Sequence, residues 1–456
     1  MSILLPSRFV HVFRRDDMVA LYHSLRMRPI YFSSREWDSL SKSLGISEES
    51  MELIIDQKVI DSLYEAKIFV QSPADDDRVI DFFRSNFGRP EVSIVYFVLT
   101  DKCNFSCSYC FVRNSMPDGY QERTMSMTTA DRGLDRFCEI ISRNQETFSK
   151  EKTIIFYGGE PLMNTKVLSY LLDKIRAYKL AGKLPEKTSL SLVTNGSLIT
   201  EKIAKLLKEH AVSVGISIDG DEAVTSANRE GVKGNPIYSN VMRGFKICTN
   251  AGVDVGVSCT LSVESVKNFQ KTMKTLVDDL RIAGMGFNLA MATPGYPLPN
   301  GYAEEASKCI IDAYKVFRER GIYEDRIMRK VNAFVEAKVY PYDCGAAGGG
   351  QIVIAPDGQI GVCHGYLGER KFFCSHVQES SFDPETDPVF LEWSRRSPLF
   401  MEECQRCSAL GICGGGCPLQ ADIDTGSIWG LDSRFCVHSK KTLEWLIWDL
   451  YDQFRK

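Results

Sequence analysis

The chain has 456 residues, of which 44% are hydrophobic and 25% are charged. That composition is ordinary for globular proteins, and the length suits about three domains. The net charge of −4 gives no reason to expect bulk nucleic-acid binding. No apolar run approaches the roughly 18 residues of a membrane span, and the N-terminus lacks the apolar core of a signal peptide. The sequence therefore predicts a cytoplasmic protein without a membrane or nucleic-acid partner.

Residues 1–90 are predicted to form a small separate domain. We expect strands at 9–13, 18–22 and 28–33, helices near 35–44, 47–56 and 57–66, and a polar link at 75–77. Three strands with three helices are the winged-helix arrangement, whose usual role is DNA binding. The stretch 35–56 carries two basic residues against four glutamates: Arg35, Lys42, Glu36, Glu48, Glu49 and Glu52. That acidic surface disfavours DNA and leaves peptide recognition, in which an extended peptide adds to a sheet edge.

Residues 91–291 alternate predicted strands with predicted helices. The strands are expected at 93–100, 153–158, 189–194, 212–218, 255–261 and 285–290. The helices are expected near 128–148, 165–182, 200–210, 238–251 and 263–281. Six strands with intervening helices predict an α/β fold built on a parallel barrel. Residues 292–342 form a bridge that contains an amphipathic helix at 303–320.

Three cysteines follow the first of these strands with the spacing C-x3-C-x2-C: Cys103, Cys107 and Cys110. A short loop with this spacing can place three thiolates on one face of a 4Fe–4S cluster, which needs four ligands. The fourth iron would then be open to a ligand that is not protein. The loop leaves the carboxyl end of a strand, where α/β folds place their chemistry. The alternative interpretation is a zinc knuckle or unrelated thiols.

Four further landmarks follow at or just past the ends of later predicted strands. Gly158 and Gly159 lack a Cβ, so a ligand can approach their backbone, and Glu160 can accept a charge-assisted hydrogen bond from an ammonium group. The later landmarks offer polar and charged partners for hydroxyl and carboxylate groups: Asn195, Ser217, Asp219 and Arg229. Each alone is weak, because such residues often form ordinary turns or surface charges.

Together with Tyr109, which precedes the last cysteine, these landmarks resemble the radical S-adenosylmethionine (SAM) enzymes in order and placement over roughly residues 91–291. The resemblance implies an incomplete six-stranded barrel. It also implies that SAM binds the open iron, with Glu160 at its amino group and Arg229 at its carboxylate. One electron would then release methionine and a 5′-deoxyadenosyl radical, which abstracts hydrogen from an unactivated carbon.

A second cysteine array lies in the C-terminal part, with the spacing C-x13-G-x4-C, a gap, C-x2-C-x5-C-x3-C, a gap and C. Its cysteines are Cys344, Cys363, Cys404, Cys407, Cys413, Cys417 and Cys436. Between the first two, 351–355 and 359–362 flank Pro356-Asp357-Gly358, which predicts a hairpin. Fifteen cysteines in a reducing compartment indicate metal binding rather than disulfides. A pair of zinc sites is the competing interpretation.

The array resembles the SPASM domain of radical SAM enzymes, which carries two auxiliary 4Fe–4S clusters. The resemblance assigns Cys344, Cys363 and Cys417 to the first auxiliary cluster, with Cys374 as a fourth ligand or a spare thiol. It assigns the other four cysteines to the second: Cys404, Cys407, Cys413 and Cys436. The chain would then hold three 4Fe–4S clusters. We expect it to be divided into four parts: 1–90, 91–291, 292–342 and 343–456. The single cysteines are expected to be buried apolar residues: Cys138, Cys248, Cys259 and Cys309.

These resemblances imply a peptide-modifying oxidoreductase. We expect a crosslink, either a thioether or a carbon–carbon bond, in a ribosomally made precursor peptide whose leader binds the N-terminal domain. A flavodoxin or ferredoxin is the expected electron donor. The alternatives are a protein maturase that makes formylglycine, as the anaerobic sulfatase-maturating enzymes do, and a DNA-binding iron–sulfur sensor, which would need no SAM-binding residues.

Overall fold

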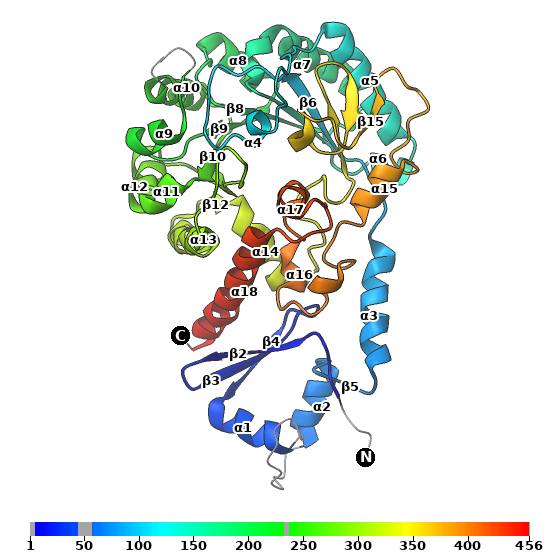
Figure 1. Cartoon of the computed structure of the whole chain (residues 1–456), viewed down its shortest axis with the longest axis vertical. Coiled ribbons are helices and arrows are strands. Elements are labelled where there is room, and N and C mark those ends of the chain that lie inside the picture. The colour runs from blue at the N-terminus through cyan, green and yellow to red at the C-terminus, as the bar shows by residue number, and fades with distance from the viewer. Residues whose placement is uncertain (1–4, 44–56, 232–236, 456) are drawn as a thin grey trace.

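The structure is a computed structural model that describes residues 5–43, 57–231 and 237–455. Figure 1 shows three tiers, with the barrel at one end, the C-terminal segment in the middle and the N-terminal sheet at the other end. The predicted helix at 47–56, with Glu48, Glu49 and Glu52, lies outside the described residues. No described helix is long and apolar enough to cross a membrane.

The N-terminal part contains the predicted three-stranded sheet. Its antiparallel strands, in the order β2-β3-β4, are β2 (Val10–Arg15), β3 (Met18–His23) and β4 (Pro29–Ser33). One face packs against helices α1 (Ser34–Ser43) and α2 (Gln57–Glu65) through a small apolar core that includes Leu21 and Trp37. A two-stranded sheet of β1 (Leu5–Pro6) and β5 (Phe69–Val70) closes the base.

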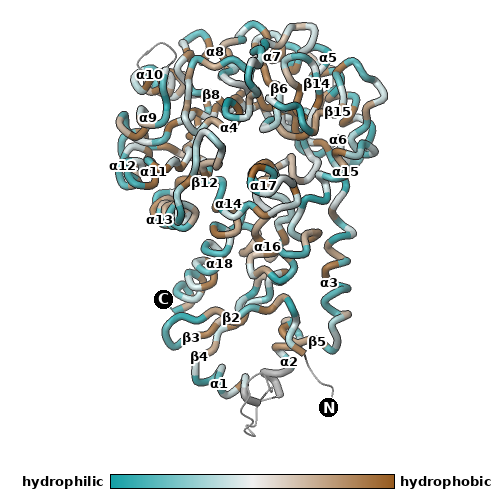
Figure 2. Tube along the Cα trace, viewed as in Figure 1, coloured by the Kyte–Doolittle hydropathy of each residue, from teal (hydrophilic) through white to brown (hydrophobic). Residues whose placement is uncertain are grey.

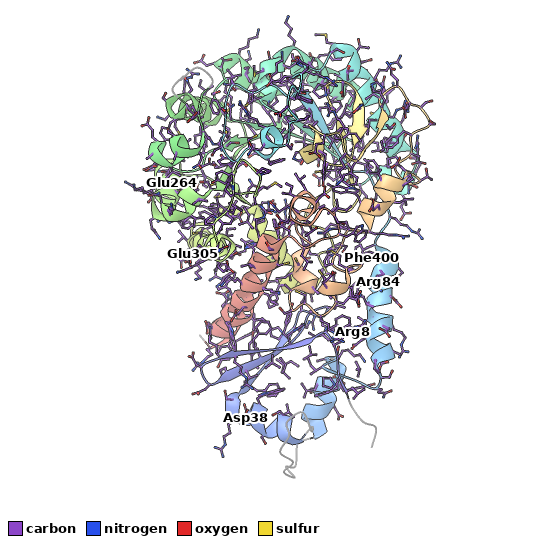
Figure 3. All side chains as sticks on the ribbon, viewed as in Figure 1. Arg8, Asp38, Arg84, Glu264, Glu305 and Phe400 are labelled. Atoms are coloured by element: carbon purple, nitrogen blue, oxygen red, sulfur yellow. The ribbon has the colours of Figure 1, made fainter. Side chains whose placement is uncertain are left out.

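The acidic stretch 75–77 is not a polar link, as the sequence suggested, but the first turn of helix α3 (Pro73–Asn86). Ser72 caps this helix, and Asp75 completes a capping box, so the acidic side chains lie where the helix dipole favours them. Along the same helix, Arg84 Nε donates to the Leu399 carbonyl at 2.9 Å and the guanidinium faces the Phe400 ring (Figure 3). Helix α3 therefore ties the N-terminal sheet to the C-terminal segment.

The six predicted barrel strands are confirmed as one parallel run. They are β6 (Ile94–Thr100), β7 (Thr153–Gly158), β8 (Ser189–Thr194), β9 (Val212–Ser217), β10 (Val255–Leu261) and β11 (Gly284–Leu289). The longer helices between them are α5 (Met127–Ser142), α7 (Thr165–Leu180), α8 (Glu201–Glu209) and α10 (Tyr238–Asn250). The shorter ones are α4 (Phe111–Asn114), α6 (Gln145–Phe148), α9 (Glu222–Asn228) and a 3₁₀ turn at Pro161–Asn164.

The single helix predicted at 263–281 is wrong. The segment is divided into α11 (Val263–Lys267), α12 (Phe269–Lys274) and a π-helical turn at Thr275–Asp279. The Asn268 amide donates to the Glu264 carbonyl and to its carboxylate, so the side chain competes with the regular helix ladder at the break.

The sheet extends beyond the six strands at both edges. Strand β12 (Tyr323–Glu324) pairs with β11, and β13 (Gln351–Ile354) pairs in parallel with β6. Strands β14 (Gln359–Gly361) and β15 (Phe373–His376) continue antiparallel from β13. The hairpin predicted around Gly358 is therefore confirmed, and it belongs to the same ten-stranded sheet as the barrel.

Figure 2 colours the chain by hydropathy and shows hydrophobic residues along the barrel strands. Successive residues of these strands differ in burial and in residue type. Outward side chains such as Phe97, Phe156 and Phe287 are fully buried beneath the helices. The alternate, inward positions on β8 to β11 hold mostly small or polar residues that are partly exposed, among them Ser191, Ser217, Gly256, Ser258 and Asn288. Because the side-chain period of a strand is two, this alternation leaves room inside the barrel for a ligand.

The remaining helices connect the barrel to the N-terminal sheet. They are α13 (Tyr302–Arg320), α14 (Asp325–Glu336), α15 (Pro388–Ser394), α16 (Leu410–Cys413), α17 (Pro418–Thr425) and α18 (Ser433–Phe454), with 3₁₀ turns at His364–Tyr366 and Glu402–Cys404. Tyr31 of β4 donates to the Ile447 carbonyl of α18 and packs against Tyr451. The C-terminal helices thus cover the second face of the N-terminal sheet.

Candidate active site

The first cysteine group, Cys103, Cys107 and Cys110, lies in the loop that follows β6. Burial is the main reason why the pKa of Cys103 is raised to about 12 and that of Cys107 to about 11, and neighbouring thiols of the group contribute to both shifts. The three sulfurs therefore lie close enough to act on one another. A set of three thiols that ionise only with a compensating cation fits a metal cluster with three protein ligands.

Gly158 and Gly159 hold this loop in place. The Gly159 N–H donates to the Thr100 carbonyl and the Glu160 N–H to the Lys102 carbonyl, each at 2.8 Å. A Cβ on Gly159 would lie 2.3 Å from the Lys102 carbonyl oxygen, and one on Gly158 would lie 2.2 Å from that of Thr100. The close approach that the structure shows at these two glycines is that of the cysteine-loop backbone, and their contact with a ligand stays a prediction.

Glu160 is fully buried, and three donors reach its carboxylate. Oε1 accepts from the Leu162 N–H at 3.0 Å and the Thr194 hydroxyl at 2.7 Å, and Oε2 accepts from the Asn195 N–H at 2.8 Å. Burial raises its pKa, and these hydrogen bonds oppose that shift. The Glu160 side chain is therefore fixed at the junction of β7 and β8, where the cysteine loop passes.

Asn195, predicted as a SAM contact, forms a small polar network with the cysteine loop. Its Nδ2 donates to Asn104 Oδ1 at 2.9 Å, and Asn104 Nδ2 donates to the Ser197 hydroxyl at 2.9 Å. The Ser197 hydroxyl in turn donates to Asn195 Oδ1 at 2.7 Å. Sequence reasoning missed Asn104 and Ser197. The signal for Asn104 was its place directly after Cys103, since loop residues beside ligands often orient them.

Asp219 and Arg229 form a buried ion pair at the end of β9. Arg229 Nε donates to Asp219 Oδ2 at 2.8 Å and Nη2 donates to Oδ1 at 3.0 Å, in the two-pronged geometry typical of arginine and carboxylate. Burial alone would lower the pKa of Arg229, but Asp219 outweighs it and keeps the guanidinium charged. The Tyr109 hydroxyl also donates to Asp219, and the Tyr109 ring lies beneath the guanidinium. Ser217, two residues before Asp219, pairs in register with Ser258.

The thiols of Cys344 and Cys417 act on Cys363, and these three cysteines, which the resemblance predicts as ligands of one cluster, are called the second cysteine group here. Burial raises the pKa of Cys363, and the thiols of Cys417 and Cys344 raise it further. The third group is likewise brought together. Burial, and then the thiols of Cys413, Cys407 and Cys436, raise the pKa of Cys404 to about 12.

Cys374, on β15, is partly buried. Burial, and then the carboxylates of Asp387 and Glu379, raise its pKa to about 12. The charged groups that affect this thiol most are therefore carboxylates rather than other cysteines. The single cysteines Cys138, Cys248 and Cys259 are buried, as predicted, and Cys309 is partly buried.

Three aromatic rings lie between the first and second cysteine groups. His364, directly after Cys363, stacks on Tyr96 with ring centroids 4.8 Å apart and lies 4.6 Å from Tyr157. The thiols of Cys110 and Cys363 both act on Tyr157, which places this ring between the two groups. Burial lowers the pKa of His364 to about 4, and its Nδ1 is buried without a hydrogen-bond partner among the described residues.

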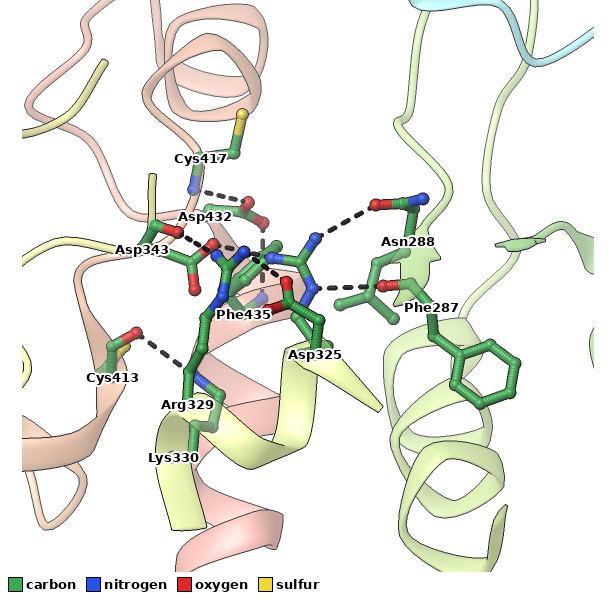
Figure 4. Close-up of polar contacts among 12 residues, drawn as sticks. Phe287, Asn288, Asp325, Arg329, Lys330, Asp343, Cys413, Cys417, Asp432 and Phe435 are labelled. Atoms are coloured by element: carbon green, nitrogen blue, oxygen red, sulfur yellow. Dashed lines mark hydrogen bonds and ion pairs between the residues drawn. The ribbon is translucent and has the colours of Figure 1, made fainter. Parts of the chain in front are cut away.

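Charged residues of α14 join the barrel to the second cysteine group (Figure 4). Arg326 Nη1 donates to Asp343 Oδ2 at 2.8 Å, and Nη2 donates to Asn288 Oδ1 of β11 at 3.2 Å. Arg329 Nη1 donates to the Asp343 carbonyl at 2.8 Å. Asp343 directly precedes Cys344, so these contacts fix the start of the cysteine segment against the barrel.

An orphaned hydroxyl supports the cluster interpretation of the third group. Ser439 lies one turn after Cys436 on α18, and its buried hydroxyl has no partner among the described residues, as a donor directed at cluster sulfur would. Within the described ranges, no three Cys, His, Asp or Glu side chains are gathered as the ligands of one metal ion would be.

The comparisons with known proteins agree with this geometry. The sequence model of the Radical SAM superfamily matches residues 97–276. The radical SAM cyclopropyl synthase TigE of Paramaledivibacter caminithermalis is 24% identical over 97% of this chain and 96% of that protein. The cysteine-type anaerobic sulfatase-maturating enzyme of Clostridium perfringens is 23% identical over 78% of this chain and 96% of that protein.

Two solved structures share the fold. The structure of anSMEcpe with bound AdoMet has a TM-score of 0.66 and 21% identity, and it covers 80% of this chain and 95% of that chain. Streptococcus suis SuiB bound to the precursor peptide SuiA has a TM-score of 0.54 and 12% identity, and it covers 95% of this chain and 99% of that chain. Residues 97–276, which include the three-cysteine loop at the end of the first barrel strand, therefore match a radical SAM domain, and the two further cysteine groups lie in the C-terminal extension beyond it.

Proposed function

We propose that this chain is a radical SAM maturase that forms an intramolecular crosslink, a thioether or a carbon–carbon bond, in a ribosomally made precursor peptide. The observation that carries the proposal is the N-terminal sheet, which is packed onto the C-terminal segment with both of its outer strands unpaired on their free sides within the described residues. An extended leader peptide can add to such an edge through main-chain hydrogen bonds.

The extent of the matches supports this choice. TigE and SuiB, the second bound to a precursor peptide, match 97% and 95% of this chain. The sulfatase-maturating enzymes match 69% to 78% of it. The cysteine-type enzyme leaves about 100 residues of this chain unmatched, which is close to the length of residues 1–90. The name cyclopropyl synthase denotes carbon–carbon bond formation in TigE, which favours the carbon–carbon alternative here.

The site residues can be assigned roles in this reaction. When bound, SAM and the cluster of the first cysteine group would supply a 5′-deoxyadenosyl radical. Glu160 would face the amino group of SAM, and Arg229 its carboxylate, while Asn195 and Ser217 offer polar contacts. Tyr109 and Asp219 hold Arg229, and Gly158 and Gly159 hold the loop.

The aromatic rings beyond that site would line the substrate position. Tyr96, Tyr157 and His364 lie between the first and second cysteine groups, so they can exclude water from the reacting segment. Peptide and SAM would give crosslinked peptide, methionine, 5′-deoxyadenosine and one proton. The electron that opens SAM is regained when the crosslink closes, so SAM is consumed as a co-substrate.

The second candidate is a protein maturase that makes formylglycine. It is favoured by the matches to the serine-type enzyme of Klebsiella aerogenes and the cysteine-type enzyme of Clostridium perfringens. Oxidation of serine to formylglycine also removes two hydrogen atoms, so mass alone does not separate the two functions. The aldehyde reacts with a hydrazide probe, whereas a thioether or carbon–carbon crosslink does not.

The test uses the reduced, reconstituted chain, SAM and the short peptide encoded beside it, without oxygen. We expect 5′-deoxyadenosine, a peptide that has lost two hydrogen atoms, no hydrazide adduct, and missing backbone fragments between the two joined residues in tandem mass spectrometry. A product that reacts with the hydrazide would show that the chain makes formylglycine and not a crosslink. An unchanged peptide, with SAM turnover on another substrate, would reject peptide maturation.

The remaining expectations belong to this proposal. Three 4Fe–4S clusters predict about twelve irons per chain in anaerobically purified protein, and zinc in their place would contradict it. A flavodoxin or ferredoxin is the proposed electron donor. The division into parts 1–90, 91–291, 292–342 and 343–456 is proposed as well, although β13 to β15 of the last part extend the barrel sheet. A cytoplasmic location stays a prediction.

A further inference from the structure

Arg396 is a fully buried cation in the C-terminal segment. Its Nη1 donates to the Gly415 carbonyl at 3.0 Å, its Nη2 to the Gly430 carbonyl at 2.9 Å, and its Nε to the Ile428 carbonyl. Within the described residues, no carboxylate lies within ion-pair distance of it, unlike the buried Arg229 and Arg434.

The negative groups that act on Arg396 are mainly thiols. They belong to two different cysteine groups: Cys404 and Cys413 come from the third and Cys417 from the second. Gly415, which accepts one of its hydrogen bonds, lies between Cys413 and Cys417 in the chain. The guanidinium therefore lies beside the segment in which the chain passes from the third cysteine group to the second.

Lys330 of α14 is a second fully buried cation in this region (Figure 4). Its Nζ donates to the carbonyls of Cys413, at 3.2 Å, and Ile412, at 3.4 Å. Asp343 and the Cys413 thiol are the negative groups that act on it, and neither forms an ion pair with it. Because its ammonium donates to the carbonyls of Ile412 and Cys413, Lys330 lies beside the third cysteine group.

Burying a cation without a paired anion is costly, and carbonyl dipoles alone offset only part of that cost. A 4Fe–4S cluster with thiolate ligands carries a net negative charge, and reduction by one electron makes this charge more negative by one. Reduction potentials of such clusters depend on nearby charge and hydrogen bonding. A buried cation at this position would therefore favour the reduced form more than the oxidised form.

We propose that Arg396 and Lys330 set the reduction potentials of the auxiliary clusters, Arg396 for both the second and third cysteine groups and Lys330 for the third alone. Both residues would act through their charge on the clusters and not by contact with the substrate. The inference rests on the auxiliary clusters of the proposed function, but not on the identity of the peptide or of the bond formed.

The test is a potentiometric titration followed by electron paramagnetic resonance. A full-length background with Cys103, Cys107 and Cys110 changed to Ala leaves only the two auxiliary clusters, and dithionite supplies one electron to each. Iron and sulfide are counted first. In this background, Lys330→Met is expected to lower the reduction potential of the cluster at the third cysteine group by about 59 mV, which is a tenfold change in the reduced-to-oxidised ratio of a one-electron couple. The potential of the other auxiliary cluster should stay unchanged. Arg396→Met is expected to lower both.

Two controls separate charge from folding. Arg396→Lys and Lys330→Arg keep the positive charge and should restore potentials close to those of the background. Lys152 is a matched buried lysine, because its ammonium also donates to backbone carbonyls, those of Thr147 and Lys150, while the charges acting on it come from Glu91 and Lys150. Lys152→Met should therefore change neither potential.

The outcomes are decisive in either direction. If Lys330→Met and Arg396→Met load both clusters with unchanged potentials, the proposal is wrong. If the Arg396→Met variant does not bind its full iron content, the potential measured in Lys330→Met decides whether the proposal holds. A shift of the same size in Lys152→Met would also overturn the proposal, because it would show a general effect of losing a buried charge. Failure of the unaltered chain to bind about twelve irons would instead reject the cluster assignment itself.

Discussion

At the scale of single residues, the site depends on buried polar groups that satisfy one another. Asp219 accepts hydrogen bonds from Arg229, the Tyr109 hydroxyl and the Thr260 N–H at 3.0 Å, all from separate segments. In a buried pair, loss of one partner leaves the other charge uncompensated, which costs more than the pair contributes. The Asp219 carboxylate therefore links the cysteine loop to β10 as well as holding Arg229.

Asp219→Asn should lower the free energy of unfolding by about 3–5 kcal/mol, because the Arg229 guanidinium would remain buried without its counter-charge. Urea denaturation followed by circular dichroism measures this change. Glu209→Gln is the control, since its pair with Arg176 is exposed on both sides and should change stability by less than about 1 kcal/mol. Equal losses in the two variants would contradict the role given to Asp219.

Cys374 offers a second prediction at this scale. Cys363→Ser should lower the iron content by about four per chain, because it removes a ligand of the second cysteine group. Cys374→Ser should leave the iron content unchanged, because its thiol lies beside Asp387 rather than beside other cysteines. Iron and sulfide assays on anaerobically reconstituted protein distinguish the two. Equal iron loss in Cys363→Ser and Cys374→Ser would indicate that Cys374 is the fourth ligand.

His23 predicts a pH dependence. Burial, and then the Arg26 charge, lower its pKa from 6.5 to about 4, and its Nδ1 accepts the N–H groups of Leu25 and Arg26. Between these values the unfolded chain binds a proton that the native chain does not, so stability falls as pH decreases from 6.5 towards 4, by up to about 3 kcal/mol. Hydrogen exchange of residues 9–26 at pH 7 and about pH 5, corrected for intrinsic rates, measures the effect. His23→Asn should lose most of this dependence, and an unaltered dependence would assign it to another group.

At the scale of elements, the ends of the strands hold the cysteine loop at several points. The end of β7 provides the Gly159 and Glu160 N–H groups, and the turn after β8 provides Asn195. At the end of α9 and just after it, the carbonyls of Asn228 and Glu230 accept the N–H groups of Ser108 and Ser106 at 2.9 and 2.7 Å. A loop that lacks secondary structure is thus fixed by backbone hydrogen bonds to separate elements, which positions its three sulfurs before any metal binds.

Gly159→Ala should displace this loop, because the added Cβ would lie 2.3 Å from the Lys102 carbonyl oxygen and neither backbone can move freely. We expect loss of about four irons per chain and at least a hundredfold loss of 5′-deoxyadenosine formation, of the order seen when catalytic positioning is lost. Gly256→Ala is the control, since its Cβ would meet only a carbonyl oxygen at 3.6 Å. Full iron content in Gly159→Ala would contradict this account.

At the scale of the whole molecule, the C-terminal segment is the centre of the structure. It continues the barrel sheet through β13, holds the second and third cysteine groups, and covers one face of the N-terminal sheet. Residues of that sheet such as Tyr22 share an apolar core with Phe334 and Leu410, beside cysteines of the third group. The peptide-recognition part proposed here is therefore held against the cluster-bearing part rather than joined to it by a flexible linker.

Tyr31→Ala tests this contact between the two parts. The variant loses a hydrogen bond to the Ile447 carbonyl and the packing against Trp448 and Tyr451, so we expect destabilisation of about 2 kcal/mol. Hydrogen exchange should accelerate in β2–β4 and along α18 while the barrel strands remain protected. Tyr64→Ala, on α2, is the control and should leave α18 unchanged. Uniform acceleration throughout the chain would indicate global rather than interfacial destabilisation.

Much of the site could be predicted from the sequence because its chemistry is local. The spacing of Cys103, Cys107 and Cys110 and the alternation of strands and helices depend on residues that are close in the chain, so the barrel strands and the cysteine loop followed from pattern alone. The break near Asn268 and the helix at 75–77 were missed because side-chain competition and capping outweigh periodicity there.

The pattern of residues along the chain was enough to predict the candidate site residues: the cysteines, the glycines and the polar residues at strand ends. Their contacts in three dimensions could not be predicted in this way. The folded structure showed that the backbone of the cysteine loop packs against Gly159, that Arg229 is paired with Asp219, and that carboxylates rather than thiols are the charged groups that affect Cys374 most. It also placed Arg396 beside two cysteine groups. The physical reason is that such contacts join segments far apart in the chain, whose meeting depends on packing and not on spacing.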